Sequence, residues 1–225
     1  MFFGRRQRID PRAEGWRALA ADLELTPWDD LAGRLHDELG LGPGAVAPVY
    51  ALSRPGQPRL VLFDQARERV GPTGRVASLR SCVLVRAEPE VRLLSMRVTE
   101  RLGKAMELIE AGRTGSQRVE TGVDPEFDRR LAVYARDEGG ARSLLTKPVR
   151  DLLGRLLCAG TPAAELPPGR GRVPPVVVVG GRNVLLLLEE PEPVAFDRLA
   201  SSAVDMLALY VALMAATPGG TDDQP

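Results

Sequence analysis

The stretch VVVVGGRNVLLLLEE, residues 176–190, joins two apolar runs through a double glycine and decides how the chain folds. A phosphate-binding loop would need a helix to begin directly after the glycines, because the backbone N–H groups at a helix N-terminus hold the anion. Here Arg182 and Asn183 follow, and then a second apolar run. The pattern therefore predicts a β-hairpin whose turn, residues 180–183, takes positive φ at Gly and Asn. Because both runs are continuously apolar, we expect both faces of the hairpin to be covered.

Shorter runs of the same kind surround this hairpin. Strands are predicted between residues 46 and 98 and between residues 127 and 190, separated by turn residues. In the first group RPGQP is a turn, and ARERVGPTGR, residues 66–75, is predicted to be a loop. In the second group Phe127, Leu131 and Val133 alternate with polar residues, which predicts a strand.

Helices are predicted where apolar residues recur at a helical period, at residues 11–39, 99–111, 141–158 and 193–216. Within the first region Thr26 is the expected N-cap of a second helix, with Pro27 at its first position. Thr99 is the expected cap of the helix at 99–111, and Thr146 that of the second part of 141–158. Together these elements predict an α+β fold, an antiparallel sheet covered by helices.

The polar stretch GRTGSQRVETG, residues 112–122, is the predicted boundary between two halves. We expect a flexible basic N-terminus at 1–10, a helix-rich start with a β-meander at 11–112, a second unit at 123–217 and a disordered tail at 218–225. Both halves end with a strand followed by a helix, which indicates two similar lobes.

Composition and charge indicate a globular protein, with 44% apolar residues, 27% charged residues and a net charge of zero. Arginine is abundant, but Lys, Ile and Asn are scarce together, as a GC-rich genome produces, so the arginine count is no evidence for nucleic acid. The 4% aromatic content argues against a surface that stacks on bases. Residues 59–101 carry a surplus of four positive charges and residues 185–225 a surplus of six negative charges. Such asymmetry fits either an oppositely charged partner or complementary faces within one molecule.

Residues for catalysis or metal binding do not form a motif. His36 is the only histidine and is expected within a helix, on its surface or beside its apolar stripe. Because Cys82 and Cys158 are far apart, no zinc site and no cofactor is predicted. Both cysteines are expected to be small buried side chains in a reducing compartment. Neighbouring carboxylates occur in four places, Asp29 with Asp30, Glu88 with Glu90, Glu189 with Glu190, and Asp222 with Asp223.

Two basic segments are candidate contacts for an anionic partner. The first contains Arg67, Arg69, Arg75 and Arg80, with a solvated loop as the alternative interpretation. The second is the N-terminus, where Phe2, Phe3, Arg5, Arg6 and Arg8 fit weak peripheral membrane contact, with a frayed terminus as the alternative. The longest apolar segment, residues 203–216, is shorter than the roughly 20 residues of a spanning helix. We therefore expect a cytoplasmic protein, with contact to the inner face of the membrane as an alternative.

One long segment carries a resemblance. DPEFDRRLAVYARDEGGARSLLTKPVRDLL, residues 124–153, with the hairpin and the closing helix FDRLASSAVDMLALYVAL, is similar to a family of uncharacterised bacterial domains. These have a D-P-x-F-D strand and a Leu-Leu-Thr-Pro-like helix start; here Lys147 stands between Thr146 and Pro148. Members often follow a short membrane anchor, and the resemblance supplies no catalytic residues.

The leading functional hypothesis is a non-catalytic module that binds another protein, binds a second copy of itself or scaffolds an assembly. One alternative is an enzyme whose site is assembled from scattered carboxylates, arginines and His36. Another is weak binding of a membrane or nucleic acid through the basic segments.

Overall fold

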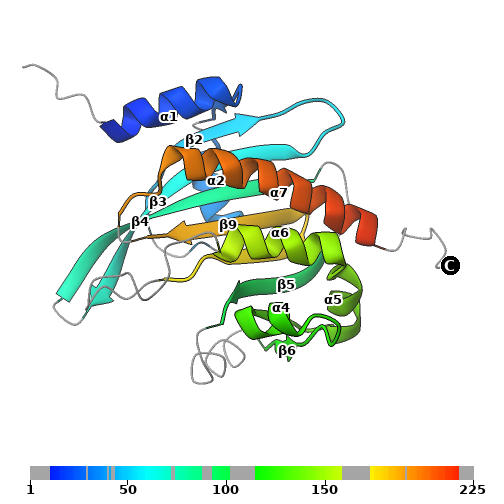
Figure 1. Ribbon diagram of the computed structural model, residues 1–225. Coiled ribbons are helices and arrows are strands. Elements are labelled where there is room, and N and C mark those ends of the chain that lie inside the picture. The colour runs from blue at the N-terminus through cyan, green and yellow to red at the C-terminus, as the bar shows by residue number, and fades with distance from the viewer. Residues whose placement is uncertain are drawn as a thin grey trace, which may run out of the picture.

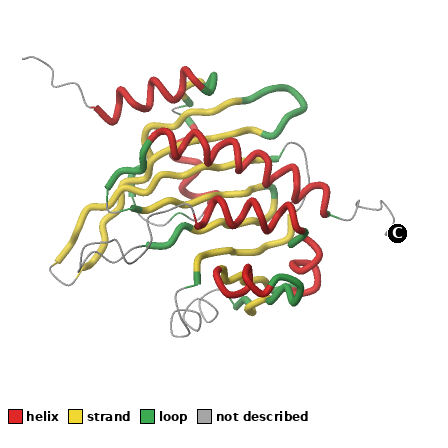
Figure 2. The backbone as a smooth tube through the Cα atoms, viewed as in Figure 1, coloured by secondary structure: helices red, strands yellow, loops and turns green. Residues whose placement is uncertain are grey.

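The computed structural model describes residues 11–28, 30–39, 41, 44–71, 74–87, 93–101, 115–158, 173–190 and 192–217. Its strands are β1 (Thr26–Pro27), β2 (Val46–Leu52), β3 (Arg59–Gly71), β4 (Gly74–Arg86), β5 (Leu93–Glu100), β6 (Gln117–Val119), β7 (Leu131–Ala135), β8 (Val176–Gly181) and β9 (Asn183–Glu189). Its helices are α1 (Pro11–Asp22), α2 (Leu31–Leu39), α4 (Pro125–Arg130), α5 (Glu138–Leu144), α6 (Lys147–Cys158) and α7 (Phe196–Ala216). The strands form one antiparallel sheet in the order β1-β2-β3-β4-β9-β8-β5-β7-β6, packed against helices (Figures 1 and 2). The predicted α+β fold is confirmed.

The β8–β9 hairpin lies in the middle of this sheet. Val179 pairs with Val184 and Gly180 with Asn183, so the turn is narrower than predicted and consists of Gly181 and Arg182. Gly181 takes a φ of +56°, whereas Asn183 is already part of the strand. The hairpin separates β4 from β5, so strands from both halves of the sequence alternate in one sheet. One sheet therefore contains strands that precede residue 112 and strands that follow residue 115.

Both faces of the hairpin are covered, as its apolar runs predict. Val177 and Leu186 belong to the larger core cluster, which includes buried side chains of α1, α5, α6 and α7. Leu185 belongs to a second cluster on the opposite face, with Leu31 and Leu35 of α2. The sheet is thus a middle layer, with most helices on one face and α2 on the other (Figure 1).

The predicted loop at residues 66–75 is wrong. β3 and β4 continue through it, paired without interruption from Arg59 and Arg86 to Gly71 and Gly74. The charged residues that indicated a loop extend a two-stranded ribbon past the core, where no buried face imposes an apolar alternation.

Phe127 is not in a strand. It lies on α4, which begins after Asp124, whose carboxylate accepts the Phe127 N–H bond at 3.0 Å, and Pro125 occupies the first turn. The strand begins only at Leu131. The alternation of apolar and polar residues crossed a helix and a strand, while the Asp-Pro pair was the better local signal.

Two predicted helix caps are also wrong. Thr26 and Pro27 form the short edge strand β1 beside β2, and α2 begins only at Leu31. Thr99 lies inside β5 and pairs with Val176 and Ala132, so no helix begins there. Residues 102–111, the rest of this predicted helix, lie outside the described residues. By contrast α6 begins directly after Thr146, whose carbonyl accepts the Arg150 N–H bond, as predicted.

α7 is longer than the apolar segment that the sequence outlines. Its 21 residues make it the one helix in the described ranges that is long and apolar enough to cross a membrane, by length and composition alone. One side of α7 is buried on the sheet, through Leu199, Ser202, Ala203, Met206, Leu209, Tyr210 and Leu213. The same apolar character therefore also fits a helix that covers a core.

Candidate protein-binding surface

The β3–β4 hairpin extends past the strands on either side of it. β2 pairs with β3 only as far as Gln65, and β9 pairs with β4 only as far as Arg80. We call residues 67–71 of β3 and 74–79 of β4 the β3–β4 arm; it extends about 16 to 20 Å, at roughly 3.3 Å a residue. Figure 1 shows the arm projecting at the lower left, and no described strand pairs with its outer edges. Since an isolated two-stranded ribbon is only marginally stable in water, the arm is suited to pair with something else.

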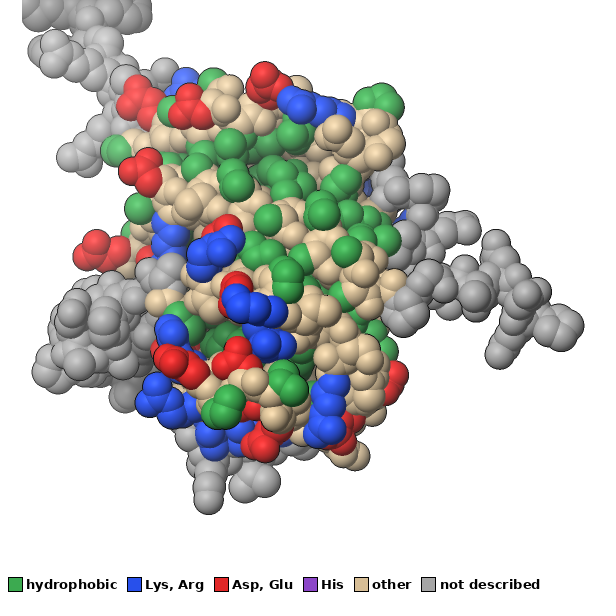
Figure 3. Space-filling view, turned by 45° about the vertical axis from the view of Figure 1, so that its right-hand side comes forward, with side chains coloured by type: hydrophobic (Ala, Val, Ile, Leu, Met, Phe, Trp, Pro, Cys, Tyr) green, Lys and Arg blue, Asp and Glu red, His purple; other side chains and the backbone are tan. Residues whose placement is uncertain are grey.

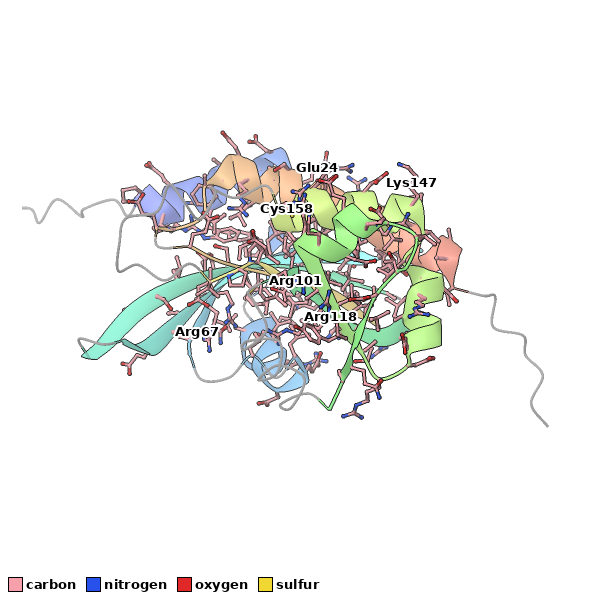
Figure 4. The ribbon with its side chains drawn as sticks, turned by 60° about the horizontal axis from the view of Figure 1, so that its bottom comes forward. Glu24, Arg67, Arg101, Arg118, Lys147 and Cys158 are labelled. Atoms are coloured by element: carbon pink, nitrogen blue, oxygen red, sulfur yellow. The ribbon has the colours of Figure 1, made fainter. Side chains whose placement is uncertain are left out.

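A buried carboxylate lies at the base of the arm. Glu189, only 4% exposed, ends β9 and accepts a hydrogen bond from Ser78 Oγ at 3.0 Å. Its other oxygen accepts from Arg80 Nη2 at 3.1 Å and from Arg67 Nη1 at 3.3 Å. Figure 4 shows Arg67 at the root of the projecting hairpin. The cluster fixes the arm to the end of β9.

Two guanidinium groups share this one carboxylate. Burial is the main cause that lowers the pKa of Arg80, and the nearby charge of Arg67 lowers it further, while Glu189 opposes both. The buried Nε of Arg67 has no hydrogen-bond partner within the part of the chain that the structure describes. The base of the arm therefore carries more positive charge than Glu189 neutralises.

The structure brings together two of the four predicted anionic contacts. Arg67 and Arg80 converge on Glu189, while Arg69 and Arg75 lie further along the arm, where the backbone pairs them with Val76 and Val70. The side chains of Arg69 and Arg75 are outside the described set. Glu189 was noted only as one of a pair of acids at a strand end, because its partners lie at least 109 positions away in sequence.

A second buried ion pair, between Arg12 and Asp64, joins α1 to the sheet and leaves no free carboxylate oxygen for a ligand. Asp64, 2% exposed, accepts bonds from Arg12 Nε and Nη2 at 3.1 Å each, from Trp16 Nε1 at 2.7 Å and from Ser81 Oγ at 2.7 Å. Both carboxylate oxygens are thus saturated by the protein itself. One sequence signal points to this ion pair, because Asp64 directly follows the apolar run of β3.

An open groove of about 850 Å³ lies between α4, α6 and α7. It is lined by Asp124, Glu126, Phe127, Arg130, Leu131, Arg150, Asp151, Gly154, Arg155, Cys158 and Asp205. Acids and arginines meet here, as the enzyme hypothesis requires, but they pair with one another. Arg150 Nε lies 3.0 Å from Asp124, and Arg155 Nη2 lies 2.8 Å from Asp205.

The electrostatics of the groove follow from these pairs. The pKa of Asp124 is lowered, first by the Phe127 N–H bond and then by the bond from Arg150. The pKa of Arg155 is raised by its hydrogen bond to Asp205. Both effects hold the groups in their charged forms, which does not suit an acid that must deliver a proton near neutral pH.

The other candidate residues are dispersed. His36 lies on α2, but its side chain is outside the described set. Cys82 is buried and burial raises its pKa, whereas Cys158 is half-buried at the groove. Glu190 pairs with Arg198. Among the residues that the structure describes, no three His, Cys, Asp or Glu side chains gather as metal ligands.

Further candidate residues fall on parts of the chain that the structure does not describe. They are Phe2, Phe3, Arg5, Arg6 and Arg8 of the basic N-terminus, and Asp29, Glu88, Glu90, Asp222 and Asp223 of the carboxylate pairs.

The outer side of α7 presents an apolar surface. Val204 and Val211 are each 62% exposed, and Ala208 and Ala215 lie exposed on the same side at helical spacing. Figure 3 shows hydrophobic side chains gathered over the upper part of this face, with charged groups mostly below them. The surface consists of small side chains and no feature of the described residues indicates what covers it.

A scan of protein-family models, a search of curated proteins and a search of solved structures each found no match to this chain.

Proposed function

We propose that the protein is a non-catalytic binding module that holds another polypeptide through its β3–β4 arm. The observation that carries this proposal is the extension of β3 and β4 beyond Gln65 and Arg80, the last residues at which neighbouring strands pair with them. No described strand pairs with the outer edges of this ribbon, and exposed sheet edges are a common site of polypeptide recognition.

The base of the arm supports the same function. The arm is attached to the sheet by a buried hydrogen-bond network. Glu189 accepts hydrogen bonds from Arg67, Arg80 and Ser78 at the point where the arm leaves the sheet. Such a network holds the ribbon in one direction, and a preorganised surface loses less conformational entropy on binding.

The alternatives have less support. Nucleic-acid binding draws its affinity from many phosphate contacts, whereas the arm and its base hold four arginines against Glu68 and Glu189. An enzyme site in the α4–α6 groove would have to use carboxylates that are already engaged by Arg150 and Arg155. Membrane contact through the N-terminus rests on residues that the structure does not describe.

The proposal is tested by shortening the arm. Residues 68–77 are replaced by Asn-Gly, a two-residue turn that closes a hairpin at the paired positions Arg67 and Ser78 and leaves the Glu189 cluster intact. The removed segment has a charge of +1, two Arg minus one Glu, so Arg17→Gln on the exposed side of α1 is the matched control. Capture from an extract of the source cells, analysed by mass spectrometry, should yield a partner with the wild type and the control but not with the shortened arm. Equal capture by all three would contradict the proposal.

A further inference from the structure

We propose that the outer edge of β4 in the arm accepts an added strand from an acidic segment of the partner. This inference rests on the proposed function and states how the partner is bound. It follows from the direction of backbone groups along β4 and from the charge at the base of the arm.

The direction of the backbone groups is fixed by one contact. The Ala66 N–H bonds the Ala45 carbonyl at 2.8 Å, so the backbone groups of Ala66 point away from β4. These groups alternate along a strand, so those of Arg67 point toward its register partner Ser78. It follows that Ala77 and Leu79 of β4 direct their N–H and C=O groups away from β3, to the outer edge.

The outer edge of β4 in the arm continues the edge with which β4 pairs to β9. β9 occupies the same side of β4 as far as the pair Arg80 and Glu189, and beyond it no described strand pairs with residues 74–79. A strand collinear with β9 would extend the same antiparallel ladder along the arm. Pairing on one edge of a ribbon supplies the third strand that a two-stranded ribbon needs for stability.

Charge selects the kind of strand. Glu189 shows how a carboxylate on the neighbouring strand is held, by Arg80 and Arg67 together. At the base of the arm two arginines thus face one acid. By sequence, the arm and its base hold four arginines against two acids, Glu68 and Glu189. An incoming strand with carboxylates is therefore favoured over a basic or apolar one.

The probes are two capped peptides, Glu-Val-Glu-Val-Glu-Val-Glu and its counterpart with Lys in place of Glu. Each is titrated into the ¹⁵N-labelled full chain at about 20 mM and about 300 mM NaCl, because salt screens exposed charges. We expect the amide signals of Ala77 and Leu79 to shift with the acidic peptide, which should bind roughly tenfold more tightly than the basic one at low salt.

Ala77→Pro removes the outward N–H group without removing a β3–β4 hydrogen bond, so it should abolish binding of the acidic peptide. Ala77→Val, the matched control, keeps the N–H group and should keep the binding. Arg67→Gln should lower the preference for the acidic peptide and leave the shifts at Ala77 in place.

Three outcomes would overturn the inference: equal affinity for both peptides, shifts away from residues 74–79, or unchanged binding by Ala77→Pro. A 20-base-pair DNA duplex that binds the arm while the acidic peptide does not would replace it with nucleic-acid recognition. If no peptide binds although shortening the arm abolishes partner capture, strand addition fails and the binding function stands. If neither experiment shows an effect of the arm, both fail.

Discussion

Arg12 of α1 and Asp64 of β3 form a two-point ion pair, with Nε and Nη2 each 3.1 Å from a different carboxylate oxygen. The same guanidinium donates to the Val194 carbonyl at 2.6 Å and lies 4.5 Å from the centre of the Phe196 ring. One side chain therefore ties the N-terminal helix to the sheet and to the start of α7. A rigid sheet is what allows β3 and β4 to project as an arm of defined direction.

Removing this tie should weaken the fold. Arg12→Ala leaves the buried carboxylate of Asp64 without its counter-charge, and breaking a buried ion pair costs about 3 kcal/mol or more. Arg17→Ala on the same helix removes an exposed side chain and should change the free energy of unfolding by less than about 0.5 kcal/mol. Urea denaturation followed by Trp fluorescence measures both. Similar values for the two variants would contradict the role of Arg12.

Gly15 should tolerate no side chain, although it lies inside a helix. A Cβ atom there would come within 1.9 Å of the Phe196 ring, which Arg12 and Trp16 hold in place. We expect Gly15→Ala to destabilise the protein by about 1–3 kcal/mol through overpacking. Gly33→Ala on α2 is the control, because a Cβ there meets nothing within 4 Å, and it should stabilise by about 0.5–1 kcal/mol. Urea midpoints that move in the same direction for both would show that α1 does not pack on Phe196 as described.

Acid should remove the contribution of the Asp124 charge. Its pKa is lowered from an ordinary value of 3.8, so the stabilisation is present above that value and is lost as the pH falls through the lower folded pKa. Asp124→Asn keeps an acceptor for the Phe127 N–H group but removes the charge that pairs with Arg150. We expect this variant to have a lower Tm than the wild type at pH 7 and the difference to shrink below about pH 4. Calorimetry at pH 7 and at about pH 3 measures the difference in Tm. A difference that is the same at both pH values would contradict the stabilising role of the Asp124 charge.

The two cysteines should differ in reactivity. Cys82 is fully buried and its pKa is raised by burial, while Cys158 is partly exposed at the groove. A maleimide at neutral pH should therefore label one thiol in the folded chain and two in urea. Cys158→Ser should remove the labelling of the folded chain. Rapid labelling of Cys82 in the native protein would show that the sheet opens far more readily than the structure indicates.

Strands that are buried on both faces were predictable from the sequence, because their side chains enter the two hydrophobic clusters in turn. The β8–β9 hairpin was found because valine and leucine fill both faces, with Leu185 and Leu186 in opposite clusters. The arm was missed because a ribbon outside the core has no buried face, so Arg67, Glu68 and Arg69 looked like a loop. Helix α4 was missed because alternation from Phe127 to Val133 outweighed the Asp124–Pro125 start signal.

The candidate site was predictable only in part. Arg67 and Arg80 were selected as a basic patch, but sequence offers no means of seeing that Glu189 joins them. The same holds for Asp64 and Arg12, which are 52 positions apart. Ion pairs between distant strands depend on the order of strands in the sheet. That order makes β9 a neighbour of β4, although the two strands are far apart in sequence.

The most direct test of binding through the arm is site-specific photo-crosslinking. Benzoylphenylalanine is placed at Ala77 in the arm and, as a control, at the exposed Ser201 on the outer side of α7, and each full-length variant is irradiated in extract of the source cells. We expect one discrete crosslinked partner from Ala77 and none from Ser201. A label at Leu79 should capture the same partner in the full arm and should lose it when residues 68–77 are replaced by Asn-Gly. A partner that crosslinks at Ser201 and not at Ala77 would contradict binding through the arm.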